Sequence, residues 1–240
     1  MTLEGSRILV IGGSSGMGFA VAEAALAEGS QVTIASSNDD RIADALRRLG
    51  GGEGACLDVT DETAVQSFFA TSGRFDHIVF TAADWVEVNH APFAELDLAA
   101  AASLFNVRFW GALAVAKHGA KSVPPGGSIT LTNGMAAHRP QKGMPEATAM
   151  AGAVEHLVVG LAVELAPIRV NGVCPGAIVT EAWDDVPPEF RSYQEARLAE
   201  QLLPRAGRPD EAAEAYLYLM RGTYTTGQVL RVEGGWSLKG

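Results

Sequence analysis

Short continuous apolar runs, separated by longer segments with helical periodicity, are the feature that most constrains this fold. The runs lack the polar alternation of a sheet with one solvated face, and they lie at residues 7–11, 31–35, 77–80, 128–131 and 168–173. Such runs are typical of parallel strands that helices cover on both faces. The intervening amphipathic patterns predict helices at residues 18–28, 41–49, 62–69, 99–117, 149–165 and 210–220.

Strands that alternate with helices require right-handed crossovers and therefore a doubly wound sheet. We predict an α/β fold with a single Rossmann-type domain over residues 1–240, in which a parallel sheet of about seven strands has helices on both faces. The 240 residues, 48% of them hydrophobic, can bury one substantial core. Residues 177–205 show no regular pattern, and loops of this length in compact domains are usually active-site lids or ligand-binding loops. We expect them to form a substrate lid.

The net charge of −10 argues against nucleic acid and anionic membranes as partners. Cys56 and Cys174 border apolar runs, so buried thiols explain them better than a disulfide does. The chain begins without the basic and apolar blocks of a secretion signal, and no apolar run looks long enough to span a bilayer. The histidines lack ligand spacing, so no metal site is expected. These observations predict a cytoplasmic protein.

A glycine-rich stretch, GGSSGMG, directly follows the first predicted strand and opens a helix. Gly12 would permit a tight turn, Gly16 would let a pyrophosphate approach the backbone, and Gly18 would let the helix pack closely. The helix N-terminus adds free N–H groups and a positive dipole end. An ordinary turn is the alternative. We predict a dinucleotide site whose residues include Gly12, Ser14, Ser15, Gly16, Met17 and Gly18.

The second predicted strand ends in ASSNDDR, the region that meets the adenosine ribose. An acidic residue at position 36 would favour NAD, and Ser36 stands there instead. Without that carboxylate a 2′-phosphate is not repelled, and Ser37, Asn38 and Arg41 supply groups that bind one. We therefore predict NADP in preference to NAD. Because no arginine directly follows the strand, the two aspartates of this stretch are alternatively read as caps of the next helix.

Together these segments resemble the short-chain dehydrogenase/reductase family through nearly the whole chain. GGSSGMG is similar to its TGxxxGxG turn, and DHIVFTAA at residues 76–83 is similar to its DILVNNAG. IRVNGVCPGAIVTEAW at residues 168–183 resembles the segment that borders the nicotinamide. The C-terminal stretches at residues 204–213 and 226–238 also match. The resemblance implies further cofactor contacts from Asp58, Val59, Thr81, Ala82, Ala83, Thr132, Pro175, Gly176, Ile178 and Thr180.

The catalytic positions of the family are filled differently in this chain. The family uses a Ser after the fifth strand, then a Tyr and a Lys on the next helix, to handle the substrate proton. Aligning GGSITLTNG with the usual GGSIVNISS places Gly134 at the Ser, Ala147 at the Tyr and Ala151 at the Lys. The helix Asn of the family is matched by Asn106. The resemblance therefore implies a cofactor site beside a degenerate catalytic site.

Several polar residues near these positions are candidate replacements. Histidine is the usual side chain for proton transfer near neutral pH, which makes His138 one candidate, and Asp84 follows the fourth predicted strand. Asn133 stands beside the lost Ser and suits a substrate carbonyl. A surface-loop histidine and a turn-capping aspartate are the plainer readings of the first two.

Three functions fit an intact cofactor turn beside lost catalytic residues. One is an atypical oxidoreductase acting on a small molecule, with conjugate reduction tolerating the losses best. Another is a hydrolase, lyase or cyclase that uses the cofactor as a scaffold, and the third is a silent cofactor-binding protein. We favour the first by analogy with the family. The resemblance also implies a homotetramer or homodimer formed through the helices at residues 99–117 and 149–165.

Overall fold

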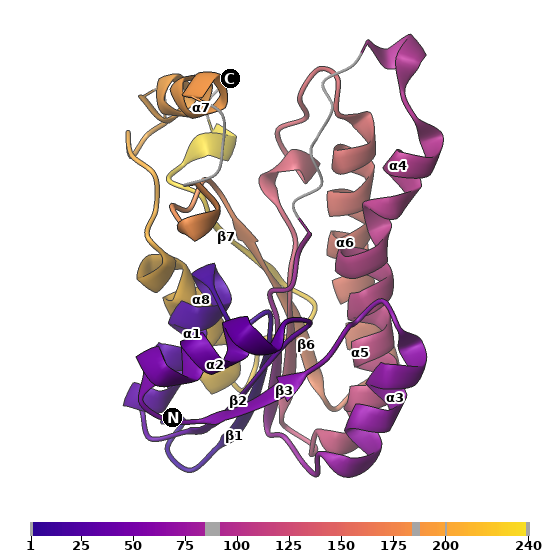
Figure 1. Cartoon of the computed structure of the whole chain (residues 1–240), viewed down its shortest axis with the longest axis vertical. Coiled ribbons are helices and arrows are strands. Elements are labelled where there is room, and N and C mark those ends of the chain that lie inside the picture. Colours follow the sequence, from indigo (N-terminus) through magenta and orange to yellow (C-terminus); the bar gives the residue numbers. More distant parts are fainter. Residues whose placement is uncertain (1, 85–91, 184–187, 200, 239–240) are drawn as a thin grey trace.

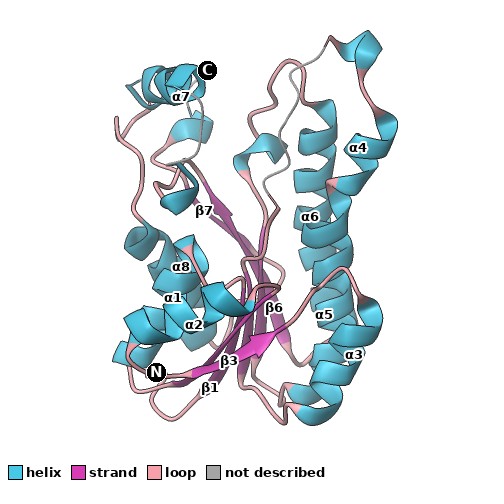
Figure 2. Ribbon diagram, in the orientation of Figure 1, coloured by secondary structure: helices cyan, strands magenta, loops and turns pink. Residues whose placement is uncertain are grey.

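The computed structural model describes residues 2–84, 92–183, 188–199 and 201–238. Within this part of the chain, seven parallel strands form one sheet in the order β3-β2-β1-β4-β5-β6-β7 (Figures 1 and 2). The strand order reverses between β1 and β4, and ligands of such sheets bind beyond the carboxyl ends near this point. The predicted fold class is confirmed. The strands are β1 (Arg7–Ile11), β2 (Gln31–Ser36), β3 (Glu53–Cys56), β4 (His77–Phe80), β5 (Ser128–Thr132), β6 (Arg169–Pro175) and β7 (Val229–Val232).

Helices cover the sheet on both faces (Figure 1). One layer contains α1 (Gly16–Ala27), α2 (Asp39–Leu49) and α8 (Pro209–Arg221). The opposite layer contains α3 (Glu62–Thr71), α5 (Ala112–Gly119) and α6 (Pro145–Glu164). Two further helices are α4 (Leu98–Ser103) and α7 (Pro188–Ala199), and short helical turns include η2 (Asn106–Gly111), η4 (Met135–Ala137) and η5 (Glu181–Trp183).

The continuous apolar strands serve two cores at once. Successive side chains of a strand point to opposite faces, so Ile8 and Val10 join the core under α1 and α8, while Leu9 and Ile11 join the core under α5 and α6. All four side chains are at most 1% exposed. A strand buried on both faces needs apolar residues at every position, which is why these runs show no alternation.

Several predicted elements differ in detail. The two edge strands, β3 and β7, were not among the five apolar runs, because an edge strand is partly solvated and its pattern is weak. The helix predicted at residues 99–117 is divided into α4, the π-helical η2 and α5. The region 177–205, expected to be irregular, contains η5 and α7. Part of that predicted lid, residues 184–187 and 200, lies outside the described residues.

The expectation that no segment is long enough to span a bilayer is wrong by length and composition. Two continuous helical stretches, Leu98–Ser122 and Pro145–Glu164, meet both criteria. The α5 part of the first stretch and the second stretch, α6, belong to the layer that packs on the sheet, as Figure 2 shows. Their apolar character therefore has two parts: an inward face in the core, and an outward face that includes Trp110, 58% exposed, and Val163, 78% exposed.

Acid should destabilise the fold through His77. This side chain is 8% exposed, and its Nδ1 lies 2.8 Å from the Ser128 hydroxyl. Burial, with a smaller effect of Arg169, lowers the pKa of His77 from 6.5 to about 4. Above pH 6.5 both folded and unfolded chains hold a neutral ring. As the pH falls toward 4, the unfolded chain binds the proton first, so the free energy of unfolding should drop by on the order of 3 kcal/mol.

Urea unfolding at pH 7 and at pH 5 checks this expectation. The His77→Gln variant should show a smaller difference between the two pH values than the wild type. The matched control is His156→Gln, because His156 is an exposed residue on α6. An equal pH effect in wild type and His77→Gln would show that other groups cause the acid sensitivity.

Candidate functional site

The glycine turn between β1 and α1 is packed so closely that its glycine positions leave little or no space for a side chain. Gly12 and Gly16 have φ of +86° and +55°, in the region that favours glycine. A Cβ on Gly12 would lie 2.5 Å from the backbone nitrogen of Ala82. One on Gly18 would lie 2.2 Å from the Gly12 carbonyl oxygen and 2.4 Å from Thr81 Oγ1. Gly18 therefore packs against the turn itself and the end of β4, not only against the sheet.

The backbone at the N-terminus of α1 faces the space beyond the carboxyl ends of the strands. Ser15, the N-cap residue, makes no side-chain cap, and the first turn of α1 contains no acidic residue. A Cβ on Gly16 would lie 3.2 Å from Thr180 Cγ2, so the helix end and the segment after β6 face each other. Free N–H groups and a positive dipole end make this a fitting place for a pyrophosphate.

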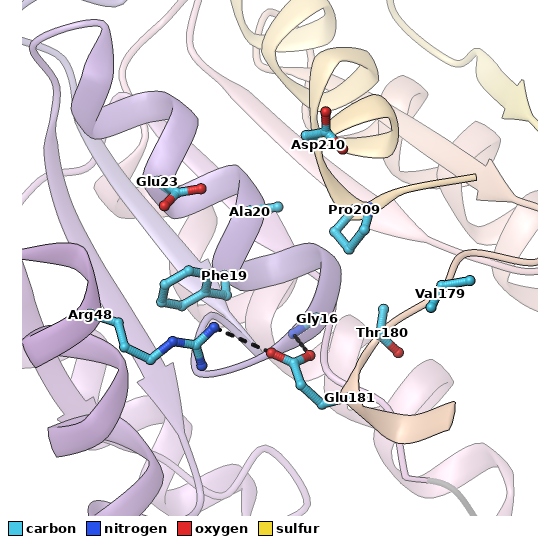
Figure 3. A pocket seen from close by; sticks show the side chains of 10 residues that line it. All are labelled: Gly16, Phe19, Ala20, Glu23, Arg48, Val179, Thr180, Glu181, Pro209 and Asp210. Carbon is cyan, nitrogen blue, oxygen red and sulfur yellow. Dashed lines mark hydrogen bonds and ion pairs between the residues drawn. The ribbon is translucent and has the colours of Figure 1, made fainter. Parts of the chain in front are cut away.

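A carboxylate from a distant part of the chain meets this helix end. Glu181 Oε2 accepts a hydrogen bond from the Gly16 N–H at 3.0 Å, and Glu181 Oε1 lies 3.3 Å from Arg48 Nη2 (Figure 3). An open pocket of about 300 Å³ lies beside this contact, lined in part by Phe19 and Thr180. Glu181 and Arg48 are not among the residues predicted from the sequence. The available signal was the position of Glu181, directly after the candidate Thr180.

The structure places the other predicted cofactor residues at the same edge of the sheet. They follow the carboxyl ends of six strands, which the doubly wound topology brings together. These residues are Ser14, Ser15 and Met17 after β1; Ser36, Ser37, Asn38 and Arg41 at and after β2; Asp58 and Val59 after β3; Thr81, Ala82 and Ala83 after β4; Thr132 at the end of β5; and Pro175, Gly176, Ile178 and Thr180 at and after β6.

At the end of β2, Asn38 has a structural role. Its Oδ1 accepts a hydrogen bond from the Arg41 N–H at 2.9 Å, so Asn38, rather than either following aspartate, caps α2. Arg41 and Ser37 are exposed, and within the described part of the chain the Arg41 guanidinium forms no ion pair. A side chain carrying an unpaired charge is therefore present where a 2′-phosphate is expected.

Two residues that were predicted to contact the cofactor use their side-chain hydroxyl groups for hydrogen bonds within the protein. Thr81 Oγ1 donates to the Ile11 carbonyl at 3.0 Å. Thr132 Oγ1 donates to the Phe80 carbonyl at 2.7 Å, and it also lies 2.7 Å from the hydroxyl of the fully buried Tyr216. Asp58 differs, because hydrogen bonds from Thr60 lower its pKa and leave an ionised, exposed carboxylate beyond β3.

Among the candidate catalytic residues, the structure brings Asn133 and His138 together around Glu155 of α6. His138 Nε2 lies 2.8 Å from Glu155 Oε2, and Asn133 Nδ2 donates to the same oxygen at 3.2 Å. The ring N–H does not point along the first of these lines, so this is an ion-pair distance and not an aligned hydrogen bond. The His138 side chain is only 18% exposed. It is therefore not the solvated loop histidine of the plainer reading.

Cys174 adjoins this cluster without offering a reactive thiol. Its Sγ lies 3.5 Å from Met135 Sδ, and the residue is fully buried. Burial, reinforced by the negative charge of Glu155, raises the pKa of Cys174 to about 12. The thiol therefore stays protonated, as expected for a cysteine that serves as a small apolar side chain.

Asp84 and Asn106 lie apart from the histidine cluster. Asn106 is exposed at the start of η2, where the π-helix interrupts the helical segment. Asp84 is half-buried, and one of its oxygens lacks a partner in the described part of the chain. Burial lowers the pKa of Arg108, also in η2, and the Asp84 charge opposes this effect. Asp84 and Arg108 are therefore near enough to interact electrostatically.

The three positions aligned with the family's catalytic residues show different surroundings. A Cβ on Gly134 would meet no atom within 4 Å, so open space lies beside the end of β5. Ala147 is 9% exposed and Ala151 is 1% exposed, both on α6. Their methyl groups are covered in the absence of any ligand, and neither can donate a proton.

Comparisons with known proteins agree with this geometry. The family model described as enoyl-(acyl carrier protein) reductase matches residues 12–237. The chain belongs to the short-chain dehydrogenase/reductase family. The short-chain dehydrogenase/reductase ATR9 of Stachybotrys chlorohalonatus (strain IBT 40285) is 36% identical over 250 residues, covering 98% of each chain. The short-chain dehydrogenase/reductase malC of Malbranchea aurantiaca is 34% identical over 256 residues, covering 99% of this chain and 96% of malC.

Two solved structures of the short-chain dehydrogenase/reductase family show the same fold over the full length. The MalC reductase/Diels-Alderase from Malbranchea aurantiaca superposes with a TM-score of 0.91 at 34% identity, covering 99% of this chain and 98% of that one. A small-chain dehydrogenase in complex with NADPH has a TM-score of 0.84 at 33% identity, with coverage of 98% and 100%. The family thus binds NADP(H), and this chain is an oxidoreductase of the short-chain dehydrogenase/reductase type.

Proposed function

We propose that this protein is an NADP(H)-dependent reductase that acts on a small, conjugated acceptor. The observation that carries the cofactor assignment is the N-terminus of α1, where a glycine cradle leaves the Gly16 N–H facing an anion. Ser36 and the unpaired Arg41 support NADP over NAD. When bound, this cofactor supplies a hydride. Asp58 stands where the resemblance to the family places the adenine.

The residues around β5 and α6 support reduction of a conjugated double bond over reduction of a simple ketone. A ketone needs a positioned acid at the oxygen, and Gly134, Ala147 and Ala151 offer none. Hydride addition to a conjugated acceptor gives a delocalised anion, which takes its proton at a different atom from the one that received the hydride. His138 follows Gly134 by four residues, and its Nε2 lies 2.8 Å from Glu155 Oε2. We propose that His138 delivers this proton.

The cofactor preference is tested at Ser36 and Arg41. Arg41→Ala should weaken NADPH binding by about 5- to 20-fold, because it removes a charge-assisted contact, and should leave NADH binding unchanged. Ser36→Asp should reverse the preference, since a carboxylate repels the 2′-phosphate and binds the ribose hydroxyls. The measurement is a fluorescence titration with each cofactor. Arg47→Ala is the matched control, because Arg47 pairs with Asp44 on the exposed side of α2. Equal losses for both cofactors would contradict the assignment.

Cyclisation is the second candidate, and the space beside Gly134 favours it. A site without a positioned acid but with free space beside it can hold a substrate in a reactive conformation. The relative described as a reductase/Diels-Alderase supports this candidate. The two reactions differ in one measurement. Reduction consumes NADPH in proportion to product, whereas cyclisation forms product while the NADPH absorbance stays constant.

We also infer that the protein self-associates through the outer faces of η2 and α6. Trp110 of η2 and Val159 and Val163 of α6 are exposed, at 58%, 49% and 78%. Apolar residues clustered on two adjacent helices are typical of an interface between subunits. Sedimentation of the purified protein tests this inference, and a monomer at micromolar concentration would contradict it.

A further inference from the structure

The Glu181 carboxylate occupies the helix end that the proposed cofactor needs. Gly16 is the first residue of α1, and its N–H donates to Glu181 Oε2 at 3.0 Å across a separation of 165 residues. Nothing else in the described part of the first turn supplies an anion, since Ser15 makes no cap and the turn contains no acidic residue. The carboxylate thus satisfies a free donor and interacts favourably with the helix dipole.

Arg48 holds this carboxylate from the other side. Its Nη2 lies 3.3 Å from Glu181 Oε1, and its guanidinium stacks over the Phe19 ring at 4.0 Å from the centroid. Figure 3 shows Glu181 between Arg48 and Gly16, joining α2, η5 and the start of α1. The Glu181 side chain is 51% exposed, so a ligand can reach the contact from solvent.

The charge state of Glu181 suits an anion mimic. Burial by itself would raise its pKa, but hydrogen bonds from backbone N–H groups, including that of Gly16, and from Arg48 outweigh this effect and lower the pKa. The side chain therefore stays ionised at neutral pH. An ionised carboxylate and a pyrophosphate cannot share one N–H donor, because the two anions repel each other.

We propose that Glu181 is an internal competitor of the cofactor pyrophosphate, which closes the phosphate site in the free chain and is displaced when the dinucleotide binds. This inference rests on the proposed function, because it requires that function's cofactor. The affinity for the dinucleotide is reduced by the fraction of chains in which Glu181 occupies the site. Displacement also frees the segment that carries Thr180, so cofactor binding and the position of η5 are coupled.

The competition distinguishes ligands by their chemistry. NADPH and NADH both carry a pyrophosphate and both compete with Glu181. Adenosine 2′-monophosphate has no pyrophosphate and reaches only the adenosine end of the site, beside Ser36 and Arg41. A change at Glu181 should therefore alter the affinity for the two dinucleotides and leave that of the nucleotide unchanged.

The experiment measures dissociation constants of the three ligands by calorimetry for wild type and Glu181→Gln. Loss of the charge should tighten NADPH and NADH binding by about 5- to 30-fold. Arg48→Gln, which loosens the hold on Glu181, should give a smaller increase. The matched control is Asp44→Asn, because Asp44 is also close to Arg48, at 3.9 Å, and the substitution changes the net charge equally. In addition, Glu181→Gln without ligand should unfold at a lower temperature, since the N-terminus of α1 loses the negative charge that interacts with its dipole.

The outcomes separate the two proposals. Unchanged or weaker dinucleotide binding by Glu181→Gln, while the wild type binds, overturns the inference and leaves the proposed function intact. Equal tightening of adenosine 2′-monophosphate, or equal tightening in Asp44→Asn, also overturns it, because the effect would then be one of general charge. Binding of neither dinucleotide by either protein overturns the proposed function together with the inference. Binding only by Glu181→Gln would support both.

Discussion

Gly18→Ala is expected to lower NADPH affinity by on the order of 100-fold. The added Cβ would lie 2.2 Å from the Gly12 carbonyl oxygen and 2.4 Å from Thr81 Oγ1. The first of these atoms is backbone and cannot turn aside, so the phosphate-binding turn must shift. Overpacking of this kind costs about 1–3 kcal/mol or more, and about 1.4 kcal/mol changes affinity tenfold. A fluorescence titration measures the change.

Gly134→Ala is the matched control for this substitution. It also adds one methyl group after a strand at the same edge of the sheet, but that methyl group meets no atom within 4 Å. The backbone at Gly134 is extended, with φ of −158°, so alanine adopts it without strain. NADPH affinity and the thermal midpoint should stay near the wild-type values. Wild-type binding by Gly18→Ala would show that the turn does not hold the cofactor as proposed.

His138→Gln is expected to lower the turnover number for reduction by about 100-fold and to leave the NADPH dissociation constant unchanged. A positioned proton donor typically contributes on the order of 10²–10⁴ in rate, and glutamine keeps much of the size of the ring without its titratable nitrogens. Glu155→Gln should give a smaller loss, because it removes the carboxylate that lies 2.8 Å from His138 Nε2 but leaves the ring in place. Steady-state kinetics with a conjugated acceptor check both values.

His156→Gln serves as the control on the same helix as Glu155. His156 is exposed, and its Nδ1 lies 3.1 Å from the Gly152 carbonyl within α6. Its loss should not change the turnover number. If His138→Gln turns over as fast as wild type, the proton comes from solvent or another group, and His138 with Glu155 is a structural pair.

Local sequence patterns were sufficient to predict the central strands and the glycine turn after β1. A strand between two helix layers must be apolar at every position, so β1, β4 and β5 are visible as short continuous runs. The glycine spacing is equally local. Positive φ or close backbone contact excludes a side chain at Gly12, Gly16 and Gly18, and these three positions fall within seven consecutive residues. The edge strands β3 and β7 face solvent in part, so their patterns carry less information.

Local sequence patterns could not predict the polar contacts of the site. The partner of the Gly16 N–H lies 165 residues further along the chain, and the position of Glu181 directly after Thr180 is the one local signal for it. Asn38 shows the same limit, since its amide suits a helix cap and a ribose contact equally until the structure shows its bond to Arg41.

The sequence by itself determined the fold class and the glycine turn after β1, and alignment with the family predicts Gly134, Ala147 and Ala151 at the catalytic positions, because each depends on neighbouring residues or on that alignment. Only the tertiary structure decided that His138 meets Glu155 and that Glu181 reaches the end of α1. Such contacts form where the sheet topology brings the ends of separate elements together. Their energies depend on distance and burial, which a linear pattern does not encode.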